Sequence, residues 1–431
     1  MSNTWIPLRA GGSHKGLWLE YKTKETSMRN LTAIMMLLSF AMPVRGDDLA
    51  AIRISDRIQN FHMPHGVVGD ARFDGPTSSN LVQIDDGDGA IWTGHYLAAE
   101  SFRYAATGSP VALAYAKRTL QSIKMLVTIS GSGKLSRTAF PADTPYVEIR
   151  PKDKDYHRTT YEGQDYYYRG NVTRDQYEGI YLGLAVAYDL IDDEEVHNLC
   201  RDLITRMTDY LIKKQWILYN PGGTGHFQTF LGRFDQMLSI LQVAKHVNPY
   251  RFSGKYKTTR FFWSWLVGFP QFIHGTHAIT SGYSGLNLDY GYFYNLIRLE
   301  QDTKIRKKYM GTYAKLRKAT KSHLNPYFNM IDFALSGADE VRDRETLQEL
   351  ESHLLRNRRN FRVDLSAKYK ACKPNISCTV IPIAERPYED FLWQRHPFAL
   401  SGGGDGSVES PGVDYILPYW MARYYGVIPA Q

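Results

Sequence analysis

The stretch Asp85-Asp86-Gly87-Asp88-Gly89-Ala90-Ile91-Trp92-Thr93-Gly94-His95-Tyr96-Leu97 places three carboxylates on a glycine-rich turn that leads directly into an amphipathic segment. After the turn, apolar residues recur at the spacing of one buried helical face. Carboxylates at a helix start are stabilised by unpaired backbone N–H groups and by the helix dipole, by about 0.3–1 kcal/mol each. The same position can also hold a catalytic acid.

The same layout recurs along the chain, which indicates a helical repeat. Gly94, Tyr96 and Leu97 correspond to Gly179, Tyr181 and Leu182, and a third copy starts near Asn287. Each copy is followed by a break and a second helical segment. We expect helices at 91–107 with 111–127, 174–191 with 196–212, 233–246 with 261–267, 287–301 with 304–320, and 326–335 with 344–356.

Five or six such hairpins, with little strand-like alternation, predict an all-α fold in which the hairpins close into an (α/α)6 toroid. In such a ring the inner helices all start on one rim, which also collects the long loops. We therefore expect the acids at the helix starts to gather there.

Length and charge limit the classes of function. The chain has 431 residues, of which 43% are hydrophobic, so a large buried core is expected. Residues 1–46 hold six Lys or Arg and two acids, which leaves +4 of the overall +8 for the rest of the chain. This mild excess suits an anionic polysaccharide and is too weak to indicate nucleic acid.

The N-terminus has the pattern of an export signal. Arg29 precedes an apolar run from Leu31 to Val44, which ends at the small residue Gly46, and Met28 is a candidate true start. The run is shorter than the roughly 20 residues of a membrane span. We expect a secreted or periplasmic protein without stable membrane association after signal removal. The expected organisation is a signal at 1–46, an N-terminal arm without regular elements at 47–90, and a single barrel at 91–431.

Three other segments carry predictions. Residues 130–170 are predicted to form a long polar loop, and Ser401 to Gly412 a lid or a backbone nest. Cys372 and Cys378 bracket a short loop and could form a local disulfide, whereas Cys200 lies in a helical pattern and is expected to be buried and inert.

Three motifs give the chain a resemblance to known enzymes: Asp88 to Gly94, Thr173 to Gly179, and Pro411 to Trp420. In this layout, over about residues 85–425, the chain resembles the six-hairpin (α/α)6-barrel carbohydrate-active enzymes. That group includes unsaturated glucuronyl hydrolases, inverting glucosidases, polysaccharide lyases and uronyl epimerases. The resemblance implies the fold and a glycan substrate by analogy, and it assigns no residue a role.

Glycoside hydrolysis requires two carboxyl groups beside the scissile bond, one protonated and one basic. We expect Asp88, Asp175 and Glu178 to be catalytic, and Arg174 and Asp289 to contact the substrate. Asp175 and Glu178 are i, i+3 neighbours on one helical face, with Arg174 close enough to keep one of them ionised. In the competing interpretation, Thr173 and Gln176 form a capping box and the acids only stabilise helix starts.

Beside these acids, we expect Asp86 and Trp92 to bind substrate, with Asp85 and Asp86 as weaker acid candidates because a turn aspartate usually bonds its own backbone. His226 with Tyr283 would suit a lyase that removes a C5 proton. Trp393 with Arg395 combines an aromatic face with a guanidinium, as sugar recognition requires. His95 is expected to be a core histidine.

The sequence therefore predicts an exported glycoside hydrolase that acts on an oligosaccharide or polysaccharide. It predicts neither a metal nor a cofactor, because Asp86 to Leu97 lacks the twelfth-position glutamate of an EF-hand, and zinc, nucleotide and esterase motifs are missing. A uronate lyase or epimerase and a non-catalytic glycan-binding barrel stay open as alternatives.

Overall fold

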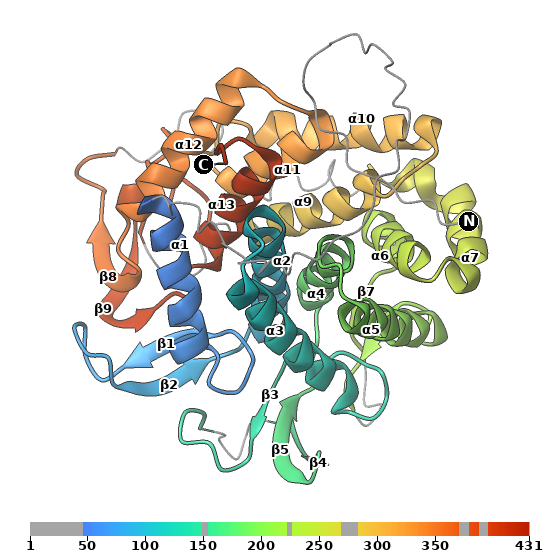
Figure 1. Cartoon of the computed structure of the whole chain (residues 1–431), viewed down its shortest axis with the longest axis horizontal. Coiled ribbons are helices and arrows are strands. Elements are labelled where there is room, and N and C mark those ends of the chain that lie inside the picture. Colours follow the sequence, from blue (N-terminus) through green and yellow to red (C-terminus); the bar gives the residue numbers. More distant parts are fainter. Residues whose placement is uncertain are drawn as a thin grey trace, which may run out of the picture. The chain divides into compact units, whose positions relative to one another are not determined.

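The computed structural model describes residues 46–148, 154–221, 226–268, 283–369, 379–387 and 395–430, all within the unit Val44–Gln431. This part of the chain is mostly helical, with some sheet (Figure 1). Its twelve α-helices are α1 (Gly46–Arg57), α2 (Gly89–Thr107), α3 (Pro110–Thr128), α4 (Arg174–Leu190), α5 (Glu194–Lys213), α6 (Phe234–Val247), α7 (Pro249–Trp263), α9 (Tyr283–Arg298), α10 (Thr303–Thr320), α11 (Pro326–Ser336), α12 (Glu340–Leu354) and α13 (Val413–Tyr425).

Most helix boundaries match the prediction, and one does not. The segment 261–267 was expected to be a helix, but α7 starts at Pro249 and ends at Trp263. The side chain of Asn248 accepts a hydrogen bond from the backbone N–H of Arg251, and Pro249 occupies the first helical turn. Asn248 and Pro249 therefore form a helix start that the apolar periodicity alone did not reveal.

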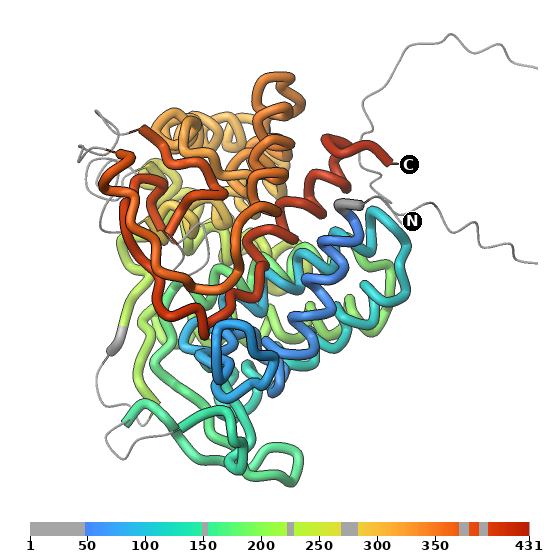
Figure 2. The backbone as a smooth tube through the Cα atoms, turned by 90° about the vertical axis from the view of Figure 1, so that its left-hand side faces the viewer, coloured from blue at the N-terminus to red at the C-terminus, as the bar shows by residue number. Residues whose placement is uncertain are grey.

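The helices differ in how much of their surface is buried. In α2, every residue from Gly89 to Arg103 is buried, whereas α10 buries only Tyr309, Tyr313, Leu316 and Thr320. Helix α2 packs against α4 and α13, α4 against α6 and α9, and α9 against α6 and α11, while α11 also packs against α13. Helices α3, α5, α7, α10 and α12 each pack on the helix that precedes them, and α1 packs on α13 (Figures 1 and 2).

Glycines allow α2 and α4 to approach each other closely. A Cβ on Gly94 would lie 2.6 Å from the backbone nitrogen of Ile180, and a Cβ on Gly179 would lie 2.7 Å from the Cα of Ile91. A Cβ on Gly183 would lie 2.9 Å from the carbonyl carbon of Gly94. The correspondence between Gly94 and Gly179 in the sequence therefore marks the crossing of two buried helices.

The strict all-α prediction is wrong, because nine strands form three antiparallel sheets in the described residues. The sheets have the strand orders β2-β1-β9-β8, β3-β5-β4 and β6-β7. The strands are β1 (Asp70–Phe73), β2 (Leu81–Asp85), β3 (Thr138–Pro141), β4 (Tyr156–Tyr161), β5 (Gln164–Arg169), β6 (Ile217–Tyr219), β7 (His226–Thr229), β8 (Arg359–Asp364) and β9 (Ser401–Glu409).

These strands correct three sequence predictions, two about loops and one about the N-terminal arm, which is described in the next paragraph. The 130–170 segment holds β3, β4 and β5, since tyrosine and threonine favour strands even without helical periodicity. The glycine-rich segment before Gly412 is strand β9 and not a lid. Gly403 and Gly406 have positive φ angles of 86° and 82°, and Cβ atoms there would collide with Phe361, where the β8–β9 register shifts. These glycines therefore serve irregularities of the strand.

The predicted N-terminal arm is also regular. Residues 47–90 include α1, β1 and β2, and β1 pairs with β9 near the C-terminus. Glu409 on β9 receives hydrogen bonds from the guanidinium of Arg57 and lies 3.3 Å from the Nε2 of His62. Ion pairs therefore join the start of the described chain to its end.

No helix in the described ranges is long and apolar enough to cross a bilayer. Cys200 is free and buried, as predicted, and burial raises the pKa of its thiol. Cys372 and Cys378 lie outside the described residues.

Candidate active site

Asp88 lies at the N-cap position of α2, but its side chain does not cap the helix. Its carboxylate pairs with the Nη2 of Arg137 at 2.6 Å and accepts a hydrogen bond from the Nε2 of Gln176 at 3.2 Å. The Asp88 side chain is 37% exposed. The Asp88 carboxylate is thus partly exposed and does not bond the backbone N–H groups of α2, so it is available to a ligand.

Asp175 lies in the first turn of α4, next to the predicted capping box of Thr173 and Gln176, which is present. Its Oδ1 accepts hydrogen bonds from the hydroxyl of Thr173 and from the backbone N–H of Gln176. Burial raises the pKa of the Asp175 carboxyl, and the negative charge of Asp88 acts in the same direction. The two carboxyl groups therefore interact, and this interaction favours the protonated form of Asp175.

Arg174 lies close enough to Asp175 for the two charges to interact, as predicted. Its Nη1 donates to the carbonyl of Thr229 at 2.8 Å, and Arg137 is the arginine whose charge opposes the raised pKa of Asp175. Burial and the charge of Arg233 lower the pKa of the Arg174 guanidinium. Arg174 therefore joins α4 to the strand β7, although it remains beside the acids.

Glu178 lies one turn deeper in α4 and is 1% exposed. Its Oε2 is 3.5 Å from the Nε2 of His95, and burial raises the pKa of its carboxyl well above the usual range. The Nδ1 of His95 bonds the carbonyl of Ile91 at 2.8 Å, so His95 is the buried core histidine that the sequence predicted. Gly291 gives Glu178 its room, since a Cβ there would lie 2.6 Å from the Glu178 carboxyl carbon.

Asp235 and Asp289 share the guanidinium of Arg233, which joins the starts of α6 and α9. Both acids are 1% exposed. Burial raises the pKa of Asp289 to about 7, against the opposing charge of Arg233. The hydroxyl of Tyr292 donates to the carbonyl of Arg174 at 2.8 Å and connects this cluster to α4. Asp289 thus lies near the start of α9, but its carboxylate is already paired with Arg233.

A cavity of about 230 Å³ opens beside Asp88. It is lined by Asp70, Asp85, Gly87, Asp88, Trp92, Arg137 and Arg169. Asp86 points elsewhere, because it is 5% exposed and accepts a hydrogen bond from the hydroxyl of Thr138, and burial raises its pKa to about 6. Asp85 bonds the backbone N–H of Gly87, as expected for a turn aspartate. Of the predicted binding residues, Trp92 therefore lines the cavity and Asp86 supports it from below.

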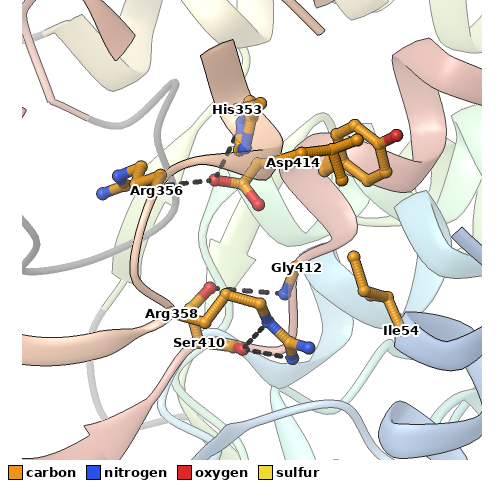
Figure 3. A pocket seen from close by; sticks show the side chains of 9 residues that line it. Ile54, His353, Arg356, Arg358, Ser410, Gly412 and Asp414 are labelled. Atoms are coloured by element: carbon orange, nitrogen blue, oxygen red, sulfur yellow. Dashed lines mark hydrogen bonds and ion pairs between the residues drawn. The ribbon is translucent and has the colours of Figure 1, made fainter. Parts of the chain in front are cut away.

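The acid at the start of α13 is also occupied. Asp414 forms an ion pair with Arg356 at 3.5 Å and lies 3.8 Å from the Nε2 of His353, while Arg358 donates to the carbonyl of Ser410 (Figure 3). The cavity between these groups measures only about 60 Å³. At the start of α13, the acid is therefore already paired and the cavity is too small for a sugar.

Of the remaining predicted residues, Tyr283 and Arg395 lie in the described part of the chain. The hydroxyl of Tyr283 lies 3.3 Å from the Nδ1 of His323, and both side chains are buried. Arg395 is exposed. His226 starts β7, but its side chain lies outside the described part of the chain, as does Trp393. The pairing of His226 with Tyr283 and that of Trp393 with Arg395 therefore stay predictions.

Sequence reasoning missed Arg137, Arg169 and Arg233. Arg137 and Arg169 come from the segment that was assigned to a loop. Arg233 did leave a signal, because it directly precedes α6, where a cation is disfavoured by the helix dipole. An arginine at such a position indicates a specific acidic partner, here Asp235 and Asp289.

In the described residues, no group of three or more histidine, cysteine, aspartate or glutamate side chains is arranged to hold a metal ion. No protein-family model matches the chain, and no curated protein sequence is significantly similar to it.

Proposed function

We propose that the chain is an exported glycoside hydrolase whose helices form a six-hairpin (α/α)6 toroid. The helix contacts support this architecture, because they run from α2 through α4, α6, α9 and α11 to α13 and then return to α2. In such a ring, each of these helices starts on the same rim. Export follows only from the apolar pattern of residues 31–44.

One observation carries the proposed reaction: Asp88 and Asp175, from the starts of two different helices, both accept hydrogen bonds from Gln176, and Asp88 lines an open cavity. Burial raises the pKa of Asp175, which makes it the proton donor to the glycosidic oxygen. Asp88, paired with Arg137, supplies the basic carboxylate on the other side of the bond. Glu178 is too deep to reach substrate, so we assign it a positioning role.

The cavity also indicates the kind of sugar. Arg137 and Arg169 line it together with Trp92, which is buried. A guanidinium can bind a sugar carboxylate in a bidentate manner. We therefore propose an acidic oligosaccharide or polysaccharide as substrate.

The experiment is a screen of acidic and neutral polysaccharides for new reducing ends, with Asp88→Asn and Asp175→Asn as test variants. Each should lower turnover by about 10²–10⁴-fold, the range for loss of a general acid or base, while binding persists. Asp165→Asn is the control, since Asp165 is exposed and pairs only locally with Arg158 and Thr160. Equal turnover in all three variants would refute the assignment.

A uronate lyase or epimerase is the second candidate. It is favoured by the same guanidinium groups, because Arg137 or Arg169 could neutralise a uronate carboxylate and so acidify the C5 proton. A lyase would release products that absorb ultraviolet light through a new double bond, and an epimerase would change sugar configuration without cleavage. A non-catalytic glycan-binding barrel would bind sugars and release nothing.

A further inference from the structure

A second cavity, of about 440 Å³, is lined by residues other than those of the acidic cavity. Its volume falls within the roughly 300–1,000 Å³ that is usual for small-molecule sites. It is lined by Ser130, Ser132, Lys134, Tyr168, Tyr210, Lys214, Tyr219, Asn220 and Pro221. We call it the lysine–tyrosine pocket.

The pocket contains an unusual cation. Lys134 is 6% exposed, and its Nζ donates to the carbonyls of Gly170 and Tyr219. Burial lowers the pKa of its ammonium to about 8. In the described residues no carboxylate forms an ion pair with Lys134 or with Lys214, whose Nζ lies over the ring of Tyr219 at 5.7 Å. Lys134 is buried and Lys214 is exposed. Together the two ammonium groups give the cavity a positive charge, which favours an anionic ligand.

The other lining groups suit a sugar. Tyr168, Tyr210 and Tyr219 bring three aromatic rings from β5, α5 and β6 to one cavity. Aromatic faces pack against the apolar faces of pyranose rings. The Oδ1 of Asn220 is buried without a hydrogen-bond partner in the described structure, so it can accept a bond from a ligand hydroxyl.

The wall of the pocket is rigid and joins it to the acidic cavity. Gly170 packs directly on Pro221, where a Cβ would lie 2.6 Å from the proline Cδ. The carbonyl of Gly170 accepts from Lys134, and the next carbonyl, that of Asn171, accepts from the Nη1 of Arg137 at 3.4 Å. Arg137 lines the acidic cavity. The carbonyls of two successive residues therefore bind Lys134 of one cavity and Arg137 of the other.

We propose that the lysine–tyrosine pocket is a subsite for a uronic acid unit of the same glycan chain that is cleaved at the acidic cavity. This inference rests on the proposed function and names its substrate class. The lysines bind the sugar carboxylate and the tyrosines cover the ring. A chain that spans both cavities is bound over several units, which favours long acidic glycans over disaccharides.

The test compares an acidic oligosaccharide with the same oligosaccharide after reduction of its carboxyl groups. Lys214→Gln and Tyr168→Ala are the test variants, because Lys134 also joins two backbone segments and its loss could unfold the pocket. Lys214→Gln should weaken binding of the acidic chain by about ten-fold, the usual value of one charged hydrogen bond, and should leave binding of the reduced chain unchanged. Tyr168→Ala removes ring packing and should therefore weaken binding of both chains to a similar degree. Lys255→Gln, an exposed change on α7, is the control for net charge.

Binding is measured by titration calorimetry in the Asp175→Asn background, so the result does not depend on turnover. Unchanged affinity in Lys214→Gln and Tyr168→Ala, or equal affinity for the acidic and reduced chains, would overturn the subsite. If no variant or glycan shows turnover but the acidic chain binds through Lys214, the hydrolase proposal fails and the pocket stands. If turnover is lost in Asp175→Asn while Lys214→Gln binds the acidic chain normally, the subsite proposal fails and the hydrolase proposal stands.

Discussion

The close contact between α2 and α4 makes Gly179→Ala a sharp test of the structure. The new Cβ would lie 2.7 Å from the Cα and 2.8 Å from the carbonyl carbon of Ile91, well inside normal contact distance. Both contacts are to backbone, so no side chain can rotate away and the helices must separate. Overpacking of this kind costs about 3 kcal/mol, and the better helix propensity of alanine returns up to about 1 kcal/mol. We expect a net loss of about 2 kcal/mol.

Gly311→Ala is the matched control, since Gly311 is an exposed glycine inside α10 with nothing near its missing Cβ. It should stabilise the protein by about 0.5–1 kcal/mol. Unfolding entropy scales with chain length, so for a unit of this size 1 kcal/mol corresponds to about 1–2 °C in Tm. Thermal unfolding should thus show a lower Tm for Gly179→Ala and a slightly higher one for Gly311→Ala. Equal or raised Tm in both variants would contradict the glycine crossing.

Three further predictions concern the charged groups. Arg233→Met removes the guanidinium that two buried carboxylates share and should cost about 3–5 kcal/mol at neutral pH. Arg251→Met breaks an exposed ion pair and should change Tm little. Burial alone would raise the pKa of Glu409, but hydrogen bonds from His62 and Arg57 outweigh it and lower the pKa. The ionised Glu409 therefore stabilises the fold above the unfolded pKa of about 4.3, and this stabilisation is lost as pH falls. In Glu409→Gln, Tm should consequently decrease less steeply as the solution is made acidic. Turnover should decline as pH rises through the raised pKa of Asp175, and a rate that is constant across that range would exclude Asp175 as the acid.

Local patterns in the sequence were sufficient to predict most of the helices and the position of several acids near helix starts. Asp88, Asp175 and Asp289 each lie at a helix start or in its first two turns, and parallel neighbouring helices bring their starts together. The glycines shared by the first two repeats predicted a common plan, and they lie where those two helices touch.

Other parts of the site depend on distant segments, so local pattern could not predict them. Arg137 reaches Asp88 across 49 residues, from a segment whose tyrosines and threonines form strands. The sequence also did not predict how deeply each acid is buried. Asp175 and Glu178 share a helical face, but three residues advance a helix by about 4.5 Å along its axis. That step takes the carboxyl from a partly exposed rim into the core, where Glu178 is 1% exposed.

The pair of His95 and Glu178 shows how such a buried carboxyl can be kept without a full charge. A carbonyl can only accept, so the bond from Nδ1 to Ile91 places the histidine proton on Nδ1. Burial lowers the pKa of His95 to about 4, which leaves Nε2 as an acceptor facing the carboxyl. Because burial also raises the pKa of Glu178, the pair is best satisfied by a protonated carboxyl that donates to Nε2.

Glu178→Gln separates the neutral pair from an ion pair. If the carboxyl is protonated, the amide N–H replaces its O–H as the donor, and Tm should change by less than the equivalent of about 1 kcal/mol. Glu178→Met removes the donor and should cost about 1–3 kcal/mol. An ionised glutamate beside an imidazolium would instead make Glu178→Gln cost about 3–5 kcal/mol, because a buried cation would lose its partner. A Tm for Glu178→Gln as low as that of Glu178→Met, or lower, would therefore show that a charged pair lies between α2 and α4.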